Sequence, residues 1–174
     1  MNICDVLTAD HVNGPGMRVS VFVSGCRNHC PGCFNPETWD FSAGREYTDF
    51  MTYAIVNELQ REGYQGLSIL GGEPFEKENQ KGLLPLLRRV KRALPEKDIW
   101  IYTGYTYEDL LPGGKQHTEE TDEILEICDV LVDGPFVLEE KDITLRFRGS
   151  ANQRLIDVKK SREAGQVILC QAIP

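Results

Sequence analysis

The chain has 174 residues, with 19 Lys and Arg against 27 Asp and Glu, and a formal net charge of −8. This length is typical of a single domain, which we expect to span residues 1–174 with a sizeable buried core. The acidic balance argues against broad nucleic-acid binding, because phosphate backbones carry the same sign of charge. No apolar run approaches the roughly 20 residues that cross a bilayer, and residues 1–5 lack the basic start of a signal peptide. We therefore expect a cytoplasmic protein with no membrane partner.

Short β-rich runs alternate along the chain with longer segments of helical period. In chain order, the sequence predicts a strand at 18–23, a helix near 48–62, a strand at 66–70, a helix within 79–94, a strand at 98–102, a helix near 119–128, a strand at 130–132 and a last edge strand at 166–169. Pro85 is expected to limit where the second helix starts, or to kink it. Strands that alternate with helices predict an α/β domain with a mostly parallel sheet.

Turns that contain glycine follow four of the predicted strands. They are Ser24-Gly25-Cys26, Gly71-Gly72-Glu73, Thr103-Gly104-Tyr105 and Asp133-Gly134-Pro135. In parallel α/β folds, ligands bind at the carboxyl ends of the strands. We therefore expect these turns to meet at one rim of the sheet and to form the functional site there.

The strongest chemical signal is the C-x3-C-x2-C spacing of Cys26, Cys30 and Cys33, directly after the first predicted strand. Thiolates are the ligands of iron–sulfur clusters, and one short loop can wrap three of them around a face of a cube. Three ligands in place of four leave one iron open for another molecule, as catalytic metal sites leave a position open. In a reducing cytoplasm, clustered cysteines indicate metal or redox chemistry and not structural disulfides.

Three other interpretations of the cysteines are open. A single buried helix face is opposed by Pro31-Gly32, which breaks a helix within the motif. A structural zinc site needs a fourth ligand. Candidates for that ligand are His29, Cys4 and His11. The second and third cysteines also have the spacing of a dithiol redox pair, although that interpretation leaves the first without a role.

The motif at the end of the first strand resembles that of the radical S-adenosylmethionine (SAM) superfamily. The resemblance implies a [4Fe–4S] cluster on Cys26, Cys30 and Cys33, with SAM bound at the open iron. It also implies an incomplete, open (β/α) barrel with mostly parallel strands and the cluster at its carboxyl rim. In this superfamily the reduced cluster cleaves SAM to methionine and a 5′-deoxyadenosyl radical, while the protein supplies geometry and shielding.

Further segments narrow the resemblance. Residues 12–18 are similar to the opening of the glycyl-radical activating enzymes. Residues 30–35, Trp39 and residues 148–153 are similar to the activating proteins of anaerobic ribonucleoside-triphosphate reductases. This implies an oxidoreductase that generates a glycyl radical near the C-terminus of the reductase large subunit, with flavodoxin or ferredoxin as electron donor. The alternatives are activation of another glycyl-radical enzyme such as pyruvate formate-lyase, a small-molecule radical SAM enzyme, and a non-catalytic zinc or electron-transfer module.

The segment Gly71-Gly72-Glu73-Pro74 resembles the superfamily's second motif, which binds the methionine amino group. Two glycines let the backbone approach a ligand closely, and an acidic side chain suits an ammonium. The residues expected to bind SAM are Gly32, Cys33, Phe34, Gly72 and Glu73. Further candidates, not assigned to this set, are Thr103 and Tyr105 for the ribose or adenine, and Asp133 for the methionine end or an associated cation. No residue is assigned as catalytic, and the basic segment 146–162 is a candidate docking surface for the partner.

Overall fold

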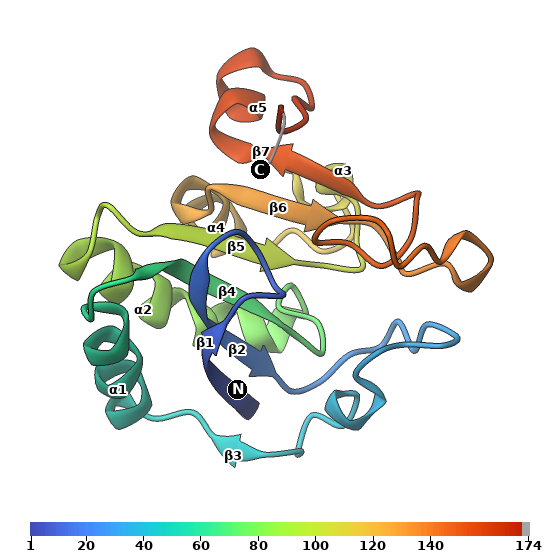
Figure 1. Cartoon of the computed structure of the whole chain (residues 1–174). Helices are drawn as coiled ribbons and strands as arrows, with labels where there is room; N and C mark the ends of the chain where they lie inside the picture. Colours follow the sequence, from blue (N-terminus) through green and yellow to red (C-terminus); the bar gives the residue numbers. More distant parts are fainter. Residues whose placement is uncertain (172–174) are drawn as a thin grey trace.

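One mixed seven-stranded sheet organises the computed structural model of the chain, which describes residues 1–171 (Figure 1). The strands, in chain order, are β1 (Asn2–Asp10), β2 (Met17–Val23), β3 (Arg45–Glu46), β4 (Tyr64–Gly71), β5 (Asp98–Tyr102), β6 (Val130–Asp133) and β7 (Arg154–Asp157). Their order across the sheet is β3-β1-β2-β4-β5-β6-β7. The central strands β2, β4, β5 and β6 run parallel, and the outer strands pair antiparallel. The sheet is not closed, and the predicted α/β class is confirmed.

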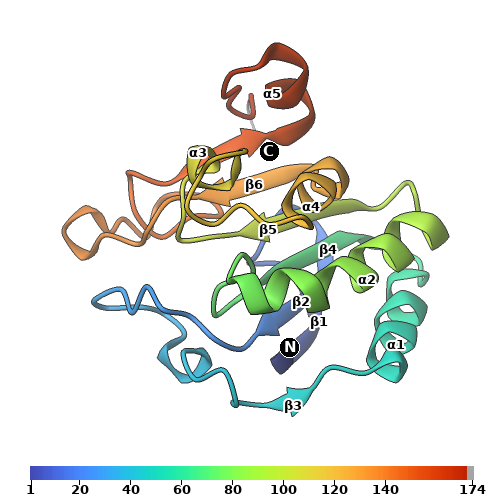
Figure 2. The same ribbon diagram turned by 180° about the vertical axis from the view of Figure 1, so that it is seen from behind.

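Helices cover one face of this sheet. They are α1 (Asp49–Leu59), α2 (Lys77–Ala93), α3 (Tyr107–Leu110), α4 (Thr121–Ile127) and α5 (Val158–Ala164), with short 3-10 turns η1 (Pro36–Thr38) and η2 (Leu138–Glu140). Figure 2 shows α1, α2 and α4 in front of the strands, with α5 beyond the β7 edge. The predicted start of the first helix is confirmed, because the Thr48 hydroxyl caps α1 by accepting from the Met51 N–H at 3.4 Å. None of the helices in residues 1–171 is both long and apolar enough to cross a membrane.

Side chains along the parallel strands alternate between the helix-covered face of the sheet and the opposite face. On β5, Ile99 and Ile101 are fully buried in the core, against Leu83 and Leu87 of α2, which recur at helical spacing. Trp100 and Tyr102 point to the opposite face, because successive strand side chains alternate. The helix-covered face therefore provides the hydrophobic core, and the other face is available to form a site.

Several predictions about individual elements are wrong. The expected edge strand at 166–169 is absent: only Leu169 forms an isolated bridge, to Ile156 in β7. The strands β1, β3 and β7 and the helices α3 and α5 were not predicted, because they are short or carry charges at exposed positions. Pro85 lies inside α2 and does not set its start, while the alternative that it kinks the helix stays a prediction. The ring is on the exposed side of the helix, where water can bind the carbonyl that loses its N–H partner.

A fully buried arginine joins three of the parallel strands on the face away from the helices. The Arg18 guanidinium of β2 lies 2.6 Å from Asp98 Oδ1 at the start of β5. It also donates to Ser68 Oγ at 2.7 Å and to the Leu67 carbonyl at 2.9 Å, both in β4. The Trp100 ring lies 5.4 Å below it. Because a buried charge is tolerated only when it is paired, this network specifies how the strands align.

We expect Arg18→Met to lower the free energy of unfolding by about 3 kcal/mol, because it leaves a partly buried carboxylate without its cation. Chemical denaturation of the metal-free chain measures the change. The matched control is Arg88→Met, which removes an exposed ion pair with Glu123 and should cost less than about 1 kcal/mol. Equal losses in the two variants would contradict a stabilising role for the buried pair.

Candidate functional site

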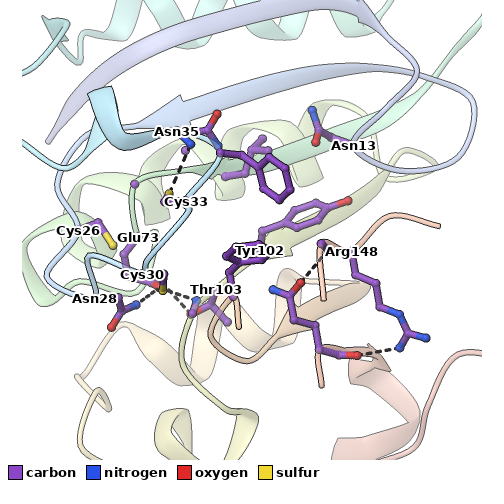
Figure 3. A pocket seen from close by; sticks show the side chains of 18 of the residues that line it. Asn13, Cys26, Asn28, Cys30, Cys33, Asn35, Glu73, Tyr102, Thr103 and Arg148 are labelled. Carbon is purple, nitrogen blue, oxygen red and sulfur yellow. Dashed lines mark hydrogen bonds between the residues drawn. The ribbon is translucent and has the colours of Figure 1, made fainter. Parts of the chain in front are cut away.

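A cavity of about 510 Å³ opens at the carboxyl ends of the parallel strands (Figure 3). Each of the four turns predicted to meet at this rim contributes a lining residue, namely Cys26, Gly72, Thr103 and Gly134. The cavity also contains the other two cysteines of the motif together with Asn28, Phe34, Glu73, Tyr102, Phe136 and Arg148. The strand-end prediction is therefore confirmed, and the cysteine and Gly-Gly-Glu motifs face one space.

The cysteine loop is a series of tight turns and not a regular element. Cys26 is buried directly beyond β2, and its N–H donates to the Trp39 carbonyl at 3.1 Å. The Cys33 N–H donates to the Cys30 carbonyl at 3.0 Å. Gly32 has φ +74°, and a Cβ there would lie 2.8 Å from a Leu138 methyl. All three thiols are free, and this backbone path brings them to the same cavity.

Burial disfavours the thiolate form of two of these residues, Cys26 and Cys30. It raises the pKa of Cys26 to about 11, and the carboxylate of Glu73 adds to the rise. Burial also raises the pKa of Cys30. Thiols bind metal as thiolates, so metal binding must release protons from this loop. The loop therefore suits a strongly cationic group that stabilises the thiolates.

The donor set fits an iron–sulfur cluster. Three thiols line one cavity, and thiolates are the usual ligands of such clusters. Within residues 1–171, no group of three or more His, Cys, Asp or Glu side chains is arranged to hold a single metal ion. Trp39 lines the same cavity, and its indole N–H is buried with no partner in the part of the chain that the structure describes. Its ring stacks on exposed His29 with centroids 4.5 Å apart. A buried donor of this kind suits an electron-rich neighbour such as a sulfide.

Glu73 is the most highly connected polar group of the site. Its side chain is 1% exposed. One carboxylate oxygen accepts from the Phe75 N–H at 2.9 Å and from the Thr103 hydroxyl at 2.7 Å. The other accepts from the Gly104 N–H at 2.7 Å and from Asn28 Nδ2 at 3.2 Å. Burial raises the pKa of Glu73 to about 7, and the first three donors oppose that rise. The carboxylate thus connects the cysteine loop to the ends of β4 and β5.

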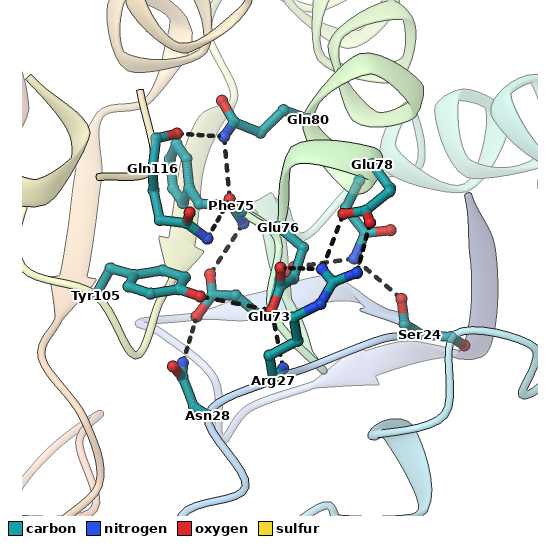
Figure 4. A network of polar contacts seen from close by, with 11 residues as sticks. Ser24, Arg27, Asn28, Glu73, Phe75, Glu76, Glu78, Gln80, Tyr105 and Gln116 are labelled. Atoms are coloured by element: carbon teal, nitrogen blue, oxygen red, sulfur yellow. Dashed lines mark hydrogen bonds and ion pairs between the residues drawn. The ribbon is translucent and has the colours of Figure 1, made fainter. Parts of the chain in front are cut away.

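A second group of contacts anchors the cysteine loop to the start of α2 (Figure 4). Buried Glu76 accepts from the Arg27 backbone N–H at 2.8 Å and from its guanidinium at 2.6 Å. The same guanidinium binds Glu78 at 2.6 Å. Asn79 donates to the carbonyls of Ser24 and Glu73, each at 2.9 Å. These contacts hold the residues that flank the first cysteine against the Gly-Gly-Glu turn.

The turn after β4 approaches the cysteine loop so closely that only glycine fits. The Gly72 N–H donates to the Val23 carbonyl at 2.8 Å. A Cβ on Gly72 would lie 2.6 Å from the Gly25 carbonyl oxygen and 2.9 Å from that of Thr38. The sequence signal of two adjacent glycines therefore reports a close approach of two backbones.

Comparison with known proteins agrees with this site. A protein-family model described as a 4Fe-4S single cluster domain matches residues 12–156. An anaerobic ribonucleoside-triphosphate reductase-activating protein of Haemophilus influenzae is 44% identical over 155 residues, 88% of this chain and 96% of that protein. Proteins of the same name from Escherichia coli strain K12 and Enterobacteria phage T4 are 41% and 39% identical, over 88% and 89% of this chain and 96% and 93% of their own lengths.

The chain belongs to the family of anaerobic ribonucleoside-triphosphate reductase-activating proteins. The resemblance drawn from the cysteine spacing and from the segments around it is therefore confirmed. The 4Fe–4S domain match supports an iron–sulfur cluster over the zinc and dithiol interpretations of the cysteines.

In this activating protein, not all of the predicted site residues line the cavity. Those that line the cavity are Cys26, Cys30, Cys33, Phe34, Gly72 and Glu73. Gly32 is not among the lining residues and shapes the turn. Of the unassigned candidates, Thr103 binds Glu73, and the Tyr105 hydroxyl approaches Glu76 at 3.5 Å. Asp133 is buried and held by Arg154 and by the Tyr107 N–H, so its contacts lie within the scaffold.

Sequence reasoning missed several lining residues. Those with polar or aromatic side chains include Asn13, Asn28, Tyr102, Phe136 and Arg148. A signal existed for Tyr102, because it alternates with the core residue Ile101 just before a strand-end turn. No sequence signal predicted that Phe136 would pack edge-on against Phe34 with ring centroids 5.1 Å apart. That contact joins segments about a hundred residues apart in the chain.

We expect Glu73→Gln to lower the free energy of unfolding of the metal-free chain by about 1–3 kcal/mol. The four donors now bind two carboxylate oxygens, whereas an amide has only one acceptor oxygen. Denaturation should be measured at pH 8, above the carboxyl pKa of about 7. The matched control, Glu78→Gln, changes only an exposed ion pair and should cost less than about 1 kcal/mol. An unchanged stability in Glu73→Gln would show that the carboxylate is not needed to hold the site together.

Proposed function

We propose that this chain is a radical SAM activating enzyme that generates a glycyl radical on an anaerobic (class III) ribonucleoside-triphosphate reductase. The observation that carries the proposal is the single cavity shared by the three cysteines of the motif and the Gly-Gly-Glu turn. The names of the relatives support the reductase as the target. When bound and reduced, the cluster supplies the electron that cleaves SAM to methionine and a 5′-deoxyadenosyl radical.

In this proposal the three thiolates hold the cluster and leave one iron vacant. Gly72 and Glu73 bind the methionine end of SAM, with Glu73 acting on the ammonium. Asn28 makes the longest of the four hydrogen bonds to Glu73, at 3.2 Å, and is the partner that an ammonium would replace most readily. Gly32, Cys33 and Phe34 border the cofactor, and Phe34 contributes an apolar wall. The hydrogen bond from the Arg27 N–H to Glu76 holds the adjacent Cys26 close to the Gly-Gly-Glu turn.

The open side of the cavity supports a protein as the substrate. Large apolar side chains are exposed on the lining residues Val12 and Phe34 and on Leu138, which lies beside Gly32 of the cysteine loop. Such a rim suits contact with another protein, and a docked segment would exclude water from the reaction. The basic segment 146–162 offers less free charge than its composition indicates, because Arg154 and Lys160 are already paired with carboxylates.

The remaining expectations are part of the same proposal. Residues 1–174 act as one radical SAM domain, with the open sheet corresponding to an incomplete (β/α) barrel. The protein works in the cytoplasm, where flavodoxin or ferredoxin supplies the electron. The absence of a membrane-spanning helix in residues 1–171 is compatible with that site of action.

Anaerobic reconstitution with iron and sulfide tests the proposal. We expect a broad visible absorbance, deoxyadenosine formation from SAM on reduction, and a glycyl radical on the reductase large subunit by electron paramagnetic resonance. Alanine at Cys26, Cys30 or Cys33 should reduce iron content and deoxyadenosine to background, because each thiolate is a cluster ligand.

The matched controls are Cys4→Ala and Cys170→Ala, which remove cysteines that do not line the cavity and should retain both iron and activity. Retention of iron and deoxyadenosine formation in a variant that lacks all three motif cysteines would refute the proposal. A radical on a different glycyl-radical enzyme, and none on the reductase, would refute the assigned target alone.

A further inference from the structure

The end of the cavity away from the cysteine loop has a feature that the cofactors do not explain. Tyr102, the last residue of β5, lines the cavity, and its hydroxyl is buried with no hydrogen-bond partner among residues 1–171. Figure 3 shows its ring extending across the cavity toward Asn13. A buried tyrosine hydroxyl usually has a partner, and leaving it unpaired destabilises the folded chain. An unpaired hydroxyl at a strand end therefore indicates a group that is completed by a ligand.

Neighbouring polar groups are already engaged within the chain. The Asn13 side-chain amide donates to Asp10 at 2.7 Å, and the Asn13 backbone carbonyl accepts from the Ser68 hydroxyl at 2.5 Å. Arg148 donates to the Gln153 carbonyl at 2.7 Å. Among residues 1–171, none of these contacts includes the Tyr102 hydroxyl.

The surroundings of this hydroxyl select a neutral partner. Phe22, Leu70 and Phe147 line the cavity with it and carry no charge. The charged groups that act on the hydroxyl are Arg18 and Asp10. They have opposite signs and are engaged within the chain, Arg18 with Asp98 and Asp10 with Ser20 and Asn13. Burial raises the pKa of Tyr102, so the hydroxyl keeps its proton and can donate. A peptide carbonyl is the neutral acceptor that a protein segment always carries.

Phe147, which lines the cavity together with Tyr102, has a strained backbone conformation. Phe147 has φ +59°, a left-handed conformation that is unfavourable for a bulky side chain. Its ring packs edge-on against Trp100, with centroids 5.5 Å apart, on the sheet face that also carries Tyr102. Strain of this kind is concentrated at ligand sites, and a segment that enters the cavity would reach the hydroxyl past this ring.

We propose that the Tyr102 hydroxyl is a binding group for the protein substrate and donates its hydrogen bond to a backbone carbonyl of the segment that carries the target glycine. This inference rests on the proposed function and specifies how the same cavity holds its substrate. The hydroxyl lies at the end of the cavity away from the cysteine loop, so the substrate carbonyl would be held across the cavity from the cofactor end. Such a contact would fix the position and orientation of the reacting carbon.

The test compares Tyr102→Phe with Tyr53→Phe, which removes an exposed hydroxyl on α1 far along the chain from the site. The substrate is the reductase large subunit from the organism that encodes this chain. For Tyr102→Phe we expect KM for the reductase to rise about three- to tenfold and more deoxyadenosine to be released per glycyl radical. The melting temperature should equal or exceed that of the parent, because the substitution removes an unpaired hydroxyl. Tyr53→Phe should match the parent in every measurement.

Two results would overturn the inference. One is an unchanged KM and an unchanged ratio of deoxyadenosine to radical in Tyr102→Phe. The other is a lower melting temperature, which would mean that the hydroxyl has a structural partner. Binding of the large subunit to the unreduced protein is measured in parallel. About three- to tenfold weaker binding in Tyr102→Phe than in the parent supports the inference, even if the parent forms no radical. Equal binding of the two proteins overturns it. Absence of the radical with the parent would instead count against the proposed function.

Discussion

The buried carboxylate of Glu73 is the contact on which the arrangement of the site depends. Its two oxygens receive donors from its own turn, from the end of β5 and from the cysteine loop. A carboxylate removed from water is stable only when its lone pairs are filled in this way. The same four contacts that satisfy the charge therefore hold the cysteine loop and two strand ends at one place.

The cysteine loop needs such external support because it contains almost no regular structure. Gly25 and Cys26 donate to carbonyls of Thr38 and Trp39, and Glu76 binds the backbone and side chain of Arg27. A cluster held here would have to overcome the raised pKa of Cys26 and Cys30, and its binding would benefit from a loop that is already positioned. The scaffold thus reduces the conformational entropy that cluster binding would otherwise lose.

The predictions that succeeded came from strong periodicity and from turn chemistry. The helix predicted within 79–94 is confirmed as α2, where Leu83, Leu87 and Val90 recur at helical spacing and are fully buried. β1 was missed because its residues alternate irregularly and several are exposed. The last strand was assigned to 166–169 on its apolar composition, yet β7 is Arg154–Asp157. Its Arg154 is accommodated there because Asp133, the last residue of β6, lies opposite it in the antiparallel pair.

By itself, the sequence determined the chemistry of this protein: three thiols at a spacing that one loop can fold around a cluster, and a Gly-Gly-Glu turn directly after a strand. Both are local properties, since they depend on residue type and short separation. Only the tertiary structure decided that Glu73 is shared by three segments, that Phe136 packs on Phe34 and that the Tyr102 hydroxyl is left unpaired. Those features depend on which distant segments meet, and side-chain alternation gives the face of a residue without giving its partner.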